Sequence, residues 1–367
     1  MSEPRTMGVE EEFLLVGPDG SPVAKAQEAL EASGNDNKER GTGALEPEFM
    51  EEQLETASHP QASLADLAVE IRAGRARAQE AADRVDARAV ALATSPIRFT
   101  GTTVSRLRYL QAREFFGITA REQLTSGCHV HVAVADDVEG VAVLDRIGPW
   151  LSVLMALSTN SPFWQGEDSD YASYRSQVWA RWPTSGPTRP FGTPQEYHAA
   201  VDALVSTGTI LDKNMVYFDA RLSPRYPTVE IRVADVCLDP DTTTVLAALA
   251  RGLVETAARE AADGRPTPPV HPELLRTASW RAGRSGLAGE LVSPSTWQPA
   301  GAHDVVGQLV AHVRDALVDA GDLDVVTELL GRLWATGGGA ARQRAWHAES
   351  GGDMRRVVER AVEVTHS

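Results

Sequence analysis

The sequence has few cysteines and none of the common glycine motifs that bind phosphate. Cys128 and Cys237 are the two cysteines in 367 residues, too few for a disulfide framework and wrongly spaced for a thiolate zinc site. A GxxxxGK[ST] loop and a strand-borne GxGxxG are both missing, so the usual P-loop and dinucleotide-binding signatures are excluded. Both cysteines fit small core positions, and their scarcity is typical of a protein in a reducing cytoplasm.

Basic residues and long apolar runs are also in short supply. The 35 Lys and Arg stand against 51 Asp and Glu, a formal net charge of −16 that disfavours nucleic acid and anionic membranes as partners. No window approaches the roughly 18 uninterrupted apolar residues of a membrane span. The opening MSEPRTMGVEEEF lacks a basic segment followed by an apolar one. We therefore expect a cytoplasmic protein that acts on small molecules, without a nucleic-acid or membrane partner.

Strand and helix patterns divide the chain into two parts. The hydrophobic fraction of 43% and the charged fraction of 23% are typical of a folded globular protein. Strands are predicted at 6–16, 97–102, 128–135, 215–224 and 228–236. Helices are predicted at 24–32, 63–92, 141–160, 241–263, 272–282, 303–320, 323–335, 338–348 and 353–364. This order indicates an α+β fold and a single catalytic domain, 1–367, with a sheet-rich part (1–240) and a helical part (241–367).

The stretch TSGCHVHVAVAD, residues 125–136, places two imidazoles inside a run of valines. Side chains two apart on a strand share a face, so His129 and His131 point together while Val130 and Val132 point the other way. Burial of the valines would leave the histidines facing solvent or a cavity. By the same rule Cys128 faces the core with the valines.

Two other predicted strands carry charged pairs at the same spacing. Glu10 and Glu12 share a face, and so do Glu230 and Arg232. If these strands adjoin, the glutamates would repel one another by several kcal/mol at an effective dielectric constant of about 20 unless a cation lies among them. Carboxylates with imidazoles favour Mg²⁺ or Mn²⁺. Two other interpretations stay open: a solvated sheet face, and zinc bound by the H-x-H pair with a glutamate.

A third acidic segment is EPEFMEEQLETAS, residues 46–58. In a regular strand Glu48 and Glu55 would face opposite ways, so a joint role requires a bulge or a bend. The alternative is an acidic surface hairpin or helix.

Five strings, in this order and spacing, resemble the glutamate-cysteine ligase type 2 family of carboxylate-amine ligases: GVEEEF, EFMEEQLETAS, GCHVHVAV, NSPFWQGEDSDYASYRS and TVEIRVAD. The likeness extends from about Thr6 to Val236. The broader kinship is with glutamine synthetase. The resemblance implies a curved antiparallel sheet that forms a half-barrel funnel backed by helices, and it suggests a homodimer.

The resemblance also implies two sets of metal ligands. Glu12, Glu48 and Glu55 look like the ligands of the metal nearest the amino-acid substrate. Glu10, His129 and Glu230 look like the ligands of the metal that accompanies the nucleotide phosphates. His131 is assigned to support or to substrate contact.

Three arginines match arginines of the family pattern. Arg232 resembles one that contacts phosphate, and Arg175 and Arg221 are similar to arginines that clamp phosphate or carboxylate. A structural salt bridge is the other interpretation of Arg175 and Arg221.

By this resemblance, the protein would be an ATP-dependent ligase that uses Mg²⁺ or Mn²⁺. It would join glutamate to an amino compound such as cysteine through an acyl phosphate. Two alternatives remain: a zinc-dependent hydrolase using His129, His131 and Glu230, and a catalytically inactive homologue that only binds ligands. The sequence names neither the amine nor a general base. Aromatic residues of the segment 160–194 are candidates for a pocket wall or for core packing: Trp164, Tyr171, Tyr174, Trp179 and Trp182.

Overall fold

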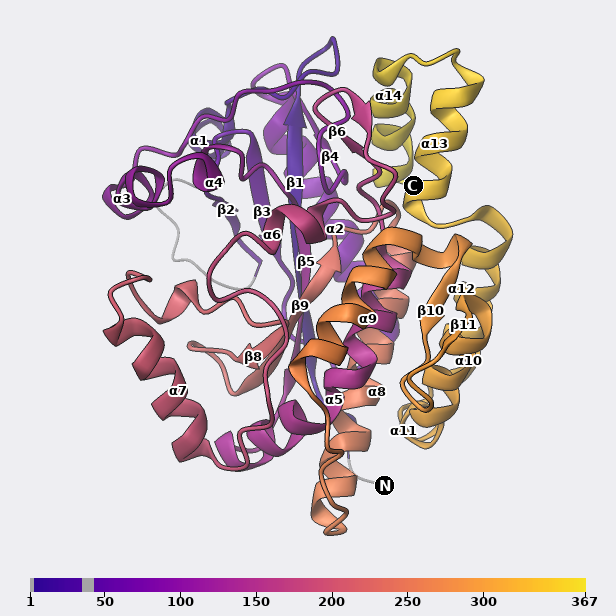
Figure 1. Ribbon diagram of the computed structural model, residues 1–367. Coiled ribbons are helices and arrows are strands. Elements are labelled where there is room, and N and C mark those ends of the chain that lie inside the picture. Colours follow the sequence, from indigo (N-terminus) through magenta and orange to yellow (C-terminus); the bar gives the residue numbers. More distant parts are fainter. Residues whose placement is uncertain (1–2, 35–42) are drawn as a thin grey trace.

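A computed structural model describes residues 3–34 and 43–367 (Figure 1). Its main sheet has seven strands in the order β2-β3-β1-β5-β9-β8, with β4 pairing the far part of β1. The strands are β1 (Met7–Val16), β2 (Leu45–Pro47), β3 (Gln53–Ala57), β4 (Arg88–Val90), β5 (Gly127–Ala133), β8 (Ala220–Leu222) and β9 (Thr228–Asp235). Their pairings are antiparallel and the sheet is not closed, which confirms the predicted antiparallel half-barrel backed by helices.

The alternation of side chains along β1, β5 and β9 gives the sheet one apolar face. Val9, Val130 and Ile231 are almost fully buried and lie in the largest hydrophobic cluster. Each contributes about 1.5–3 kcal/mol by leaving water. This face packs on α5 (Asp137–Ser158) and α8 (Pro240–Ala262), so the polar face is left for a cavity.

Helix α5 is long and apolar enough to cross a membrane by length and composition, and no other described helix is. It lies against α8, α9 (Pro272–Ser285) and β9, and most of its residues are buried inside the protein. Its apolar character is therefore explained by its place in the core.

One charged residue of β1 points into the core. Glu11 accepts hydrogen bonds from Arg75 Nη2 at 2.6 Å and Nε at 3.1 Å, and from Thr243 Oγ1 at 2.8 Å. Arg75, from α2 (Leu64–Asp83), also donates to the backbone carbonyls of Cys237, Leu238 and Thr365. Every polar group of this buried pair thus has a partner, as a charged residue on an apolar face requires.

The structure differs from two predictions at residues 63–102: one helix is shorter than predicted, and one strand is missing. The helix predicted over 63–92 ends at Asp83, because Asp86 takes a left-handed conformation (φ 54°), and β4 follows. The strand predicted at 97–102 does not form. Instead, the Phe99 amide donates to the Gln165 side chain at 3.1 Å, a hydrogen bond that takes the place of a strand partner.

The C-terminal part of the chain consists mainly of helices. The predicted helix 303–320 is two helices, α10 (Ala302–His312) and α11 (Arg314–Ala320). They are followed by α12 (Leu323–Thr336), α13 (Gly339–Glu349) and α14 (Met354–Thr365). Figure 1 shows these helices on the side of the molecule away from α3 (Leu107–Phe116) and α7 (Pro194–Ser206), two helices that the sequence patterns did not predict.

The remaining elements are short. The helices are α1 (Ala26–Ala32), α4 (Ile118–Arg121) and α6 (Arg175–Trp179), and the 3₁₀ turns are Lys213–Met215 and Gly286–Ala288. Two small hairpins pair β6 (Phe163–Trp164) with β7 (Glu167–Asp168) and β10 (Glu290–Val292) with β11 (Pro299–Gly301).

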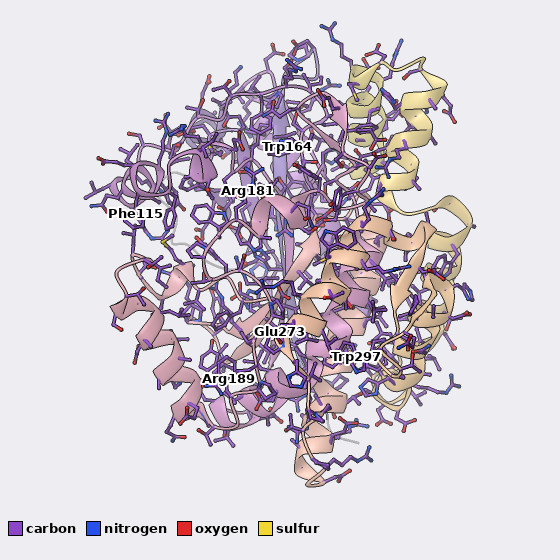
Figure 2. All side chains as sticks on the ribbon, viewed as in Figure 1. Phe115, Trp164, Arg181, Arg189, Glu273 and Trp297 are labelled. Atoms are coloured by element: carbon purple, nitrogen blue, oxygen red, sulfur yellow. The ribbon has the colours of Figure 1, made fainter. Side chains whose placement is uncertain are left out.

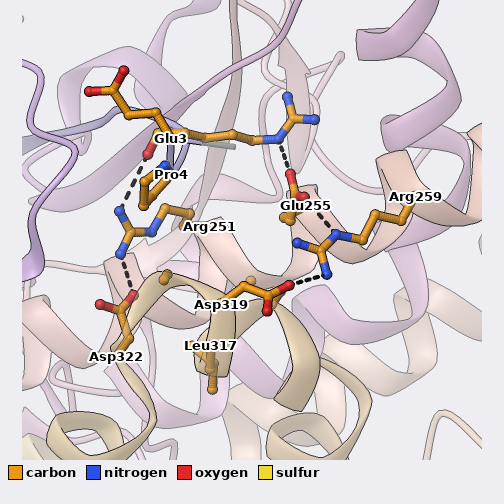
Figure 3. A pocket seen from close by; sticks show the side chains of 12 residues that line it. Glu3, Pro4, Arg251, Glu255, Arg259, Leu317, Asp319 and Asp322 are labelled. Carbon is orange, nitrogen blue, oxygen red and sulfur yellow. Dashed lines mark hydrogen bonds and ion pairs between the residues drawn. The ribbon is translucent and has the colours of Figure 1, made fainter. Parts of the chain in front are cut away.

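A cluster of ion pairs joins the start of the chain to α8 and α11 around a small cavity of about 130 Å³ (Figure 3). Arg251, which is 3% exposed, donates to Asp322 and to the backbone carbonyls of Arg5 and Ala62. Arg259 donates to Glu255 at 2.6 Å and to Asp319 at 2.7 Å. These side chains bind one another. The cluster is therefore an ion-pair network that holds the start of the chain against α8 and α11.

Candidate active site

The polar face of the sheet opens into a cavity of about 710 Å³. Strands β1, β3, β5 and β9 supply its floor, and α3, the end of α6 and the segment 214–228 supply its walls. A volume between about 300 and 1,000 Å³ is usual for a small-molecule site. The cavity is therefore large enough for substrates of the size that the sequence predicts.

Strand register brings the predicted acidic and imidazole side chains together. Glu10 lies opposite His129, Glu12 opposite Glu55, and His131 opposite Glu230. Two groups have ligand atoms within 4.8 Å of one another: Glu10 with Glu55 and His129, and Glu10 with His131 and Glu230. Glu10 belongs to both groups, and His131, predicted as a supporting residue, has a position equivalent to that of His129.

Glu48 joins the cavity because it follows β2 directly, at the point where the chain begins to turn back toward β3. Strands β2 and β3 form a hairpin, and the turn between them carries Glu48 to the same side as Glu55. Burial and the nearby charge of Glu12 raise the pKa of Glu48 to about 7. Burial and the charges of Glu48, Glu10 and Glu12 raise the pKa of Glu55 well above its usual range. Crowded carboxylates of this kind favour a cation among them.

The two histidines differ in their electrostatic surroundings. His129 Nδ1 lies 3.3 Å from Glu10 Oε2, but burial and the Arg232 charge lower the pKa of His129. His131 Nε2 lies 3.4 Å from Glu10 Oε1, and the attraction of that carboxylate outweighs burial and raises the pKa of His131. Burial opposes ionisation of Glu10, but the two imidazoles hold its pKa well below the usual range.

The donor set fits a divalent cation. The Nε2 atoms of His129 and His131 are buried and make no hydrogen bond to the described residues. A buried imidazole nitrogen that has no hydrogen bond and lies close to several carboxylates is typical of a metal ligand without its metal. Oxygen donors outnumber nitrogen donors, which favours Mg²⁺ or Mn²⁺ over zinc.

Arg221 and Arg232 both bind Glu230. Arg221 donates Nε to Glu230 Oε2 at 2.8 Å and Nη2 to Oε1 at 3.2 Å, and Arg232 Nη1 donates to Oε1. Burial opposes the charge on Glu230, yet the two guanidinium groups hold its pKa far below the usual range. Both arginines line the cavity, as does Glu230. In this arrangement Glu230 is a buried counter-ion as well as a candidate ligand.

Arg175 is not among the residues that line the cavity. It is 2% exposed, its Nη1 lies 3.9 Å from Asp235 Oδ1, and its guanidinium packs over the Trp179 ring at 5.5 Å. It also covers Gly127, where an added Cβ would lie 2.4 Å from Arg175 Nη2. The Gly127 amide donates to Glu12 Oε2 at 2.6 Å. In this structure Arg175 supports the backbone that orients Glu12.

Several cavity residues were missed by sequence reasoning. Arg106, Arg108 and Tyr109 come from α3 and its start, and Tyr217 precedes β8. The string RLRYLQAREFF has no clear apolar period, so its pattern gave no signal. Of the aromatic residues predicted as wall candidates, Trp179 and Trp182 line the cavity, whereas Trp164, Tyr171 and Tyr174 do not. Both cysteines are buried and unpaired, as predicted.

Comparison with solved structures shows the fold. A glutamate–cysteine ligase from Francisella tularensis, solved in complex with AMP, has a TM-score of 0.69 at 14% identity over 100% of this chain and 90% of its own. A bifunctional glutathione synthetase from Pasteurella multocida has a TM-score of 0.67 at 14% identity over 99% of this chain and 52% of its own. The ligase PafA, in complex with the prokaryotic ubiquitin-like protein Pup, has a TM-score of 0.54 at 13% identity, covering 98% of this chain and 67% of its own. The chain therefore shares the fold of these three proteins.

Sequence comparison shows the family. A putative glutamate–cysteine ligase 2-1 of Streptomyces avermitilis is 51% identical over 98% of this chain and 99% of its own length. A putative glutamate–cysteine ligase 2 of Streptomyces coelicolor is 50% identical over 99% of both. The family model for glutamate-cysteine ligase family 2 matches residues 6–360. The chain belongs to glutamate-cysteine ligase family 2.

Proposed function

We propose that the protein joins L-glutamate, through its γ-carboxylate, to an amino compound at the expense of ATP. One observation carries this function: a single cavity holds crowded glutamates, two histidines whose Nε2 atoms make no hydrogen bond to the described residues, and several arginines, among them Arg221 and Arg232. Such a set suits a polyphosphate held by divalent cations next to a carboxylate substrate. Family membership and the ligase names of the relatives support the same reaction class.

Activation of the acid comes first. A glutamate γ-carboxylate oxygen attacks the γ-phosphorus of ATP, the bond to the bridging oxygen breaks, and ADP leaves. The amine nitrogen then attacks the acyl carbon, phosphate leaves, and the nitrogen loses a proton. Mg²⁺ or Mn²⁺, held by Glu10, Glu12, Glu48, Glu55, His129, His131 and Glu230, would neutralise the polyphosphate charge.

Arg221 and Arg232 supply fixed positive charge for the transferred phosphoryl group. Their geometry is preset, because Glu230 holds both guanidiniums and Arg221 Nη1 also donates to the Val216 carbonyl at 2.8 Å. Preorganised charge of this kind stabilises a transition state without rearrangement of the site.

ADP release in the presence of Mg²⁺, glutamate and a panel of amines tests the proposal, with products identified by mass spectrometry. We expect ADP formation that requires glutamate and an amine, and a product mass equal to that of the γ-glutamyl amide. ADP at background with every amine, or turnover only with another acid, would contradict the glutamate assignment. A zinc hydrolase would instead retain zinc on purification and show no dependence on ATP.

A further inference from the structure

Aromatic side chains gather at one end of the cavity. Phe49, Tyr109, Trp179 and Tyr217 are half-buried lining residues, and Trp182 is buried among them. Ring centroids are 5.3 Å apart for Phe49 and Tyr109, 4.9 Å for Trp179 and Tyr217, and 5.6 Å for Trp182 and Tyr217. We call these five rings the aromatic wall.

The aromatic wall stands beside the carboxylates of the β2–β3 hairpin. Phe49 follows Glu48 directly, and the charge of Glu48 bears on both Tyr109 and Tyr217. The aromatic wall therefore adjoins Glu48, one of the glutamates that the family resemblance assigns to the metal nearest the amino-acid substrate.

The wall is rigid and only partly covered. Trp182 Nε1 donates to Gln123 Oε1 at 2.8 Å, which fixes the indole. Half-exposed rings in a cavity favour a ligand that covers their apolar faces, and aromatic rings pack well against one another in edge-to-face or offset arrangements. A small polar side chain such as that of cysteine would leave most of this surface in contact with water.

Charge near the wall restricts the ligand further. The guanidinium groups of Arg106 and Arg108 lie 6.0 and 5.8 Å from the Tyr109 ring centroid. A second cationic group on the ligand would be repelled there, whereas a neutral ring would not.

We propose that the amine acceptor is an amino compound that carries an aromatic ring, and that the aromatic wall binds this ring. The inference rests on the proposed ligase function. The acceptor nitrogen forms the C–N bond to the glutamyl acyl carbon, the bond from that carbon to the phosphate oxygen breaks, phosphate leaves with the electron pair, and the ammonium releases one proton. The aromatic wall thus determines the specificity of the enzyme for the amine acceptor.

Steady-state kinetics with ATP, Mg²⁺ and glutamate test the preference. Phenethylamine, tyramine and phenylalanine are compared with n-propylamine, 2-aminobutyrate and cysteine. We expect kcat/KM for the aromatic amines to exceed that for the small ones by about tenfold or more, the usual effect of a well-fitted apolar contact. Equal values, or a preference for cysteine with ADP still formed, would overturn the inference and leave the proposed function intact.

Phe49→Leu and Tyr217→Leu test the wall itself. Each should lower kcat/KM for phenethylamine by about tenfold more than it lowers kcat/KM for n-propylamine, so that the ratio of the two values falls. Phe115→Leu is the matched control, because Phe115 lies on α3 at the outer edge of the molecule and is 61% exposed (Figure 2). Circular dichroism melting identifies any variant that fails to fold. A rise in KM for ATP alone in both wall variants would assign the wall to the nucleotide base and overturn the inference.

Direct binding makes the test independent of turnover. Isothermal titration of the wild-type protein with phenethylamine and with n-propylamine should show tighter binding of the aromatic amine by about tenfold, and Phe49→Leu should remove the difference. If no carboxylic acid supports ADP release but phenethylamine still binds more tightly than n-propylamine, the proposed ligase reaction is wrong. The inference that the aromatic wall binds an aromatic amine would still hold. If the two amines bind equally, the aromatic acceptor is wrong whatever the reaction.

Discussion

At the scale of single residues, the candidate site combines groups that would destabilise the fold if no ligand bound to them. Glu55 lies among Glu48, Glu10 and Glu12, and burial and these charges raise its pKa. Folding brings these carboxylates together although water solvates them better. The site is therefore a place where stability and activity should respond to a mutation in opposite directions.

Glu55→Gln removes one crowded charge and keeps the shape of the side chain. We expect the metal-free variant to gain about 1 kcal/mol or more in free energy of unfolding, because repulsion from the neighbouring carboxylates is relieved. We also expect ADP release to fall at least about a hundredfold, since one metal ligand is lost. Urea denaturation without metal and the ADP assay with Mg²⁺ measure the two effects.

Glu349→Gln is the control for that change, because Glu349 is exposed on α13 and far from the sheet in sequence. It should alter neither quantity. Lower stability of the metal-free Glu55→Gln variant would contradict the account of crowded charge.

Asp219, which is not a candidate metal ligand, should make the stability of the protein depend on pH. Burial, opposed only by attraction from Arg276, raises the pKa of Asp219 from 3.8 to about 7. The folded state therefore binds this proton more tightly than the unfolded state. The contribution of Asp219 to the free energy of unfolding is fully present below pH 3.8 and is lost as the pH rises to about 7. The loss should be on the order of 2–4 kcal/mol.

Asp219→Asn should flatten this dependence and raise stability at pH 8. Urea unfolding at pH 5 and pH 8 measures both. Asp202→Asn serves as the comparison, since Asp202 is an exposed residue paired with Lys213 at 2.7 Å, and its variant should keep the wild-type slope. An unchanged slope in Asp219→Asn would show that the carboxyl is already ionised in the folded protein at pH 5.

At the scale of secondary-structure elements, the start of β5 links the long segment 160–194 to the site. Gly127 has space for no side chain because Arg175 covers it, and its amide orients Glu12. The loop side chains Ser161 and Ser173 donate to Asp235 at 2.7 and 2.8 Å, and this carboxylate faces Arg175. The loop is thereby attached to the sheet edge of the site.

Gly127→Ala should disturb this attachment. The new methyl group would meet Arg175 Nη2 at 2.4 Å and Cζ at 3.1 Å, and overpacking of this kind costs about 1–3 kcal/mol. We expect lower stability and a raised Mg²⁺ requirement in the ADP assay. Gly307→Ala is the matched substitution: it lies in α10 with no heavy atom within 4 Å of the added Cβ, and it should stabilise by up to about 1 kcal/mol.

The elements that the sequence predicted well are those with a clear period. The two-residue alternation in β1, β5 and β9 placed Glu10, His129 and Glu230 on one face, because a strand fixes which side chains share a side. The helix 63–92 and the strand 97–102 were wrong at points where a left-handed residue and a glutamine side chain decide the backbone. The position of Arg175 behind Gly127 depends on a long irregular segment, and no local pattern reveals it.

At the scale of the whole molecule, distant parts of the chain are held together by buried charges. Arg251 connects α8 with Asp322, the Arg5 carbonyl and the Ala62 carbonyl. Burial raises the pKa of Asp322, against the attraction of Arg251. One guanidinium thus links the residues before β1, the residues before α2 and the N-terminal end of α12.

Arg251→Leu should cost about 3–5 kcal/mol, because it leaves Asp322 buried without its partner. The double variant Arg251→Leu/Asp322→Leu should recover much of this loss, since two apolar side chains replace the pair. Chemical denaturation of the wild type, both single variants and the double variant completes the cycle. Additive losses in the double variant would mean that the two residues do not depend on each other.

The Glu11–Arg75 pair has a consequence for how the sheet assembles. Three successive glutamates in β1 would make neighbouring registers hard to distinguish by charge, yet a shift of one residue would send Glu10 and Glu12 into the apolar core and Glu11 into the cavity. Only the observed alignment gives Glu11 a guanidinium and the others their imidazoles. Arg75 therefore favours the native register of β1. Its removal should allow strands to pair in shifted registers and should also lower the free energy of unfolding.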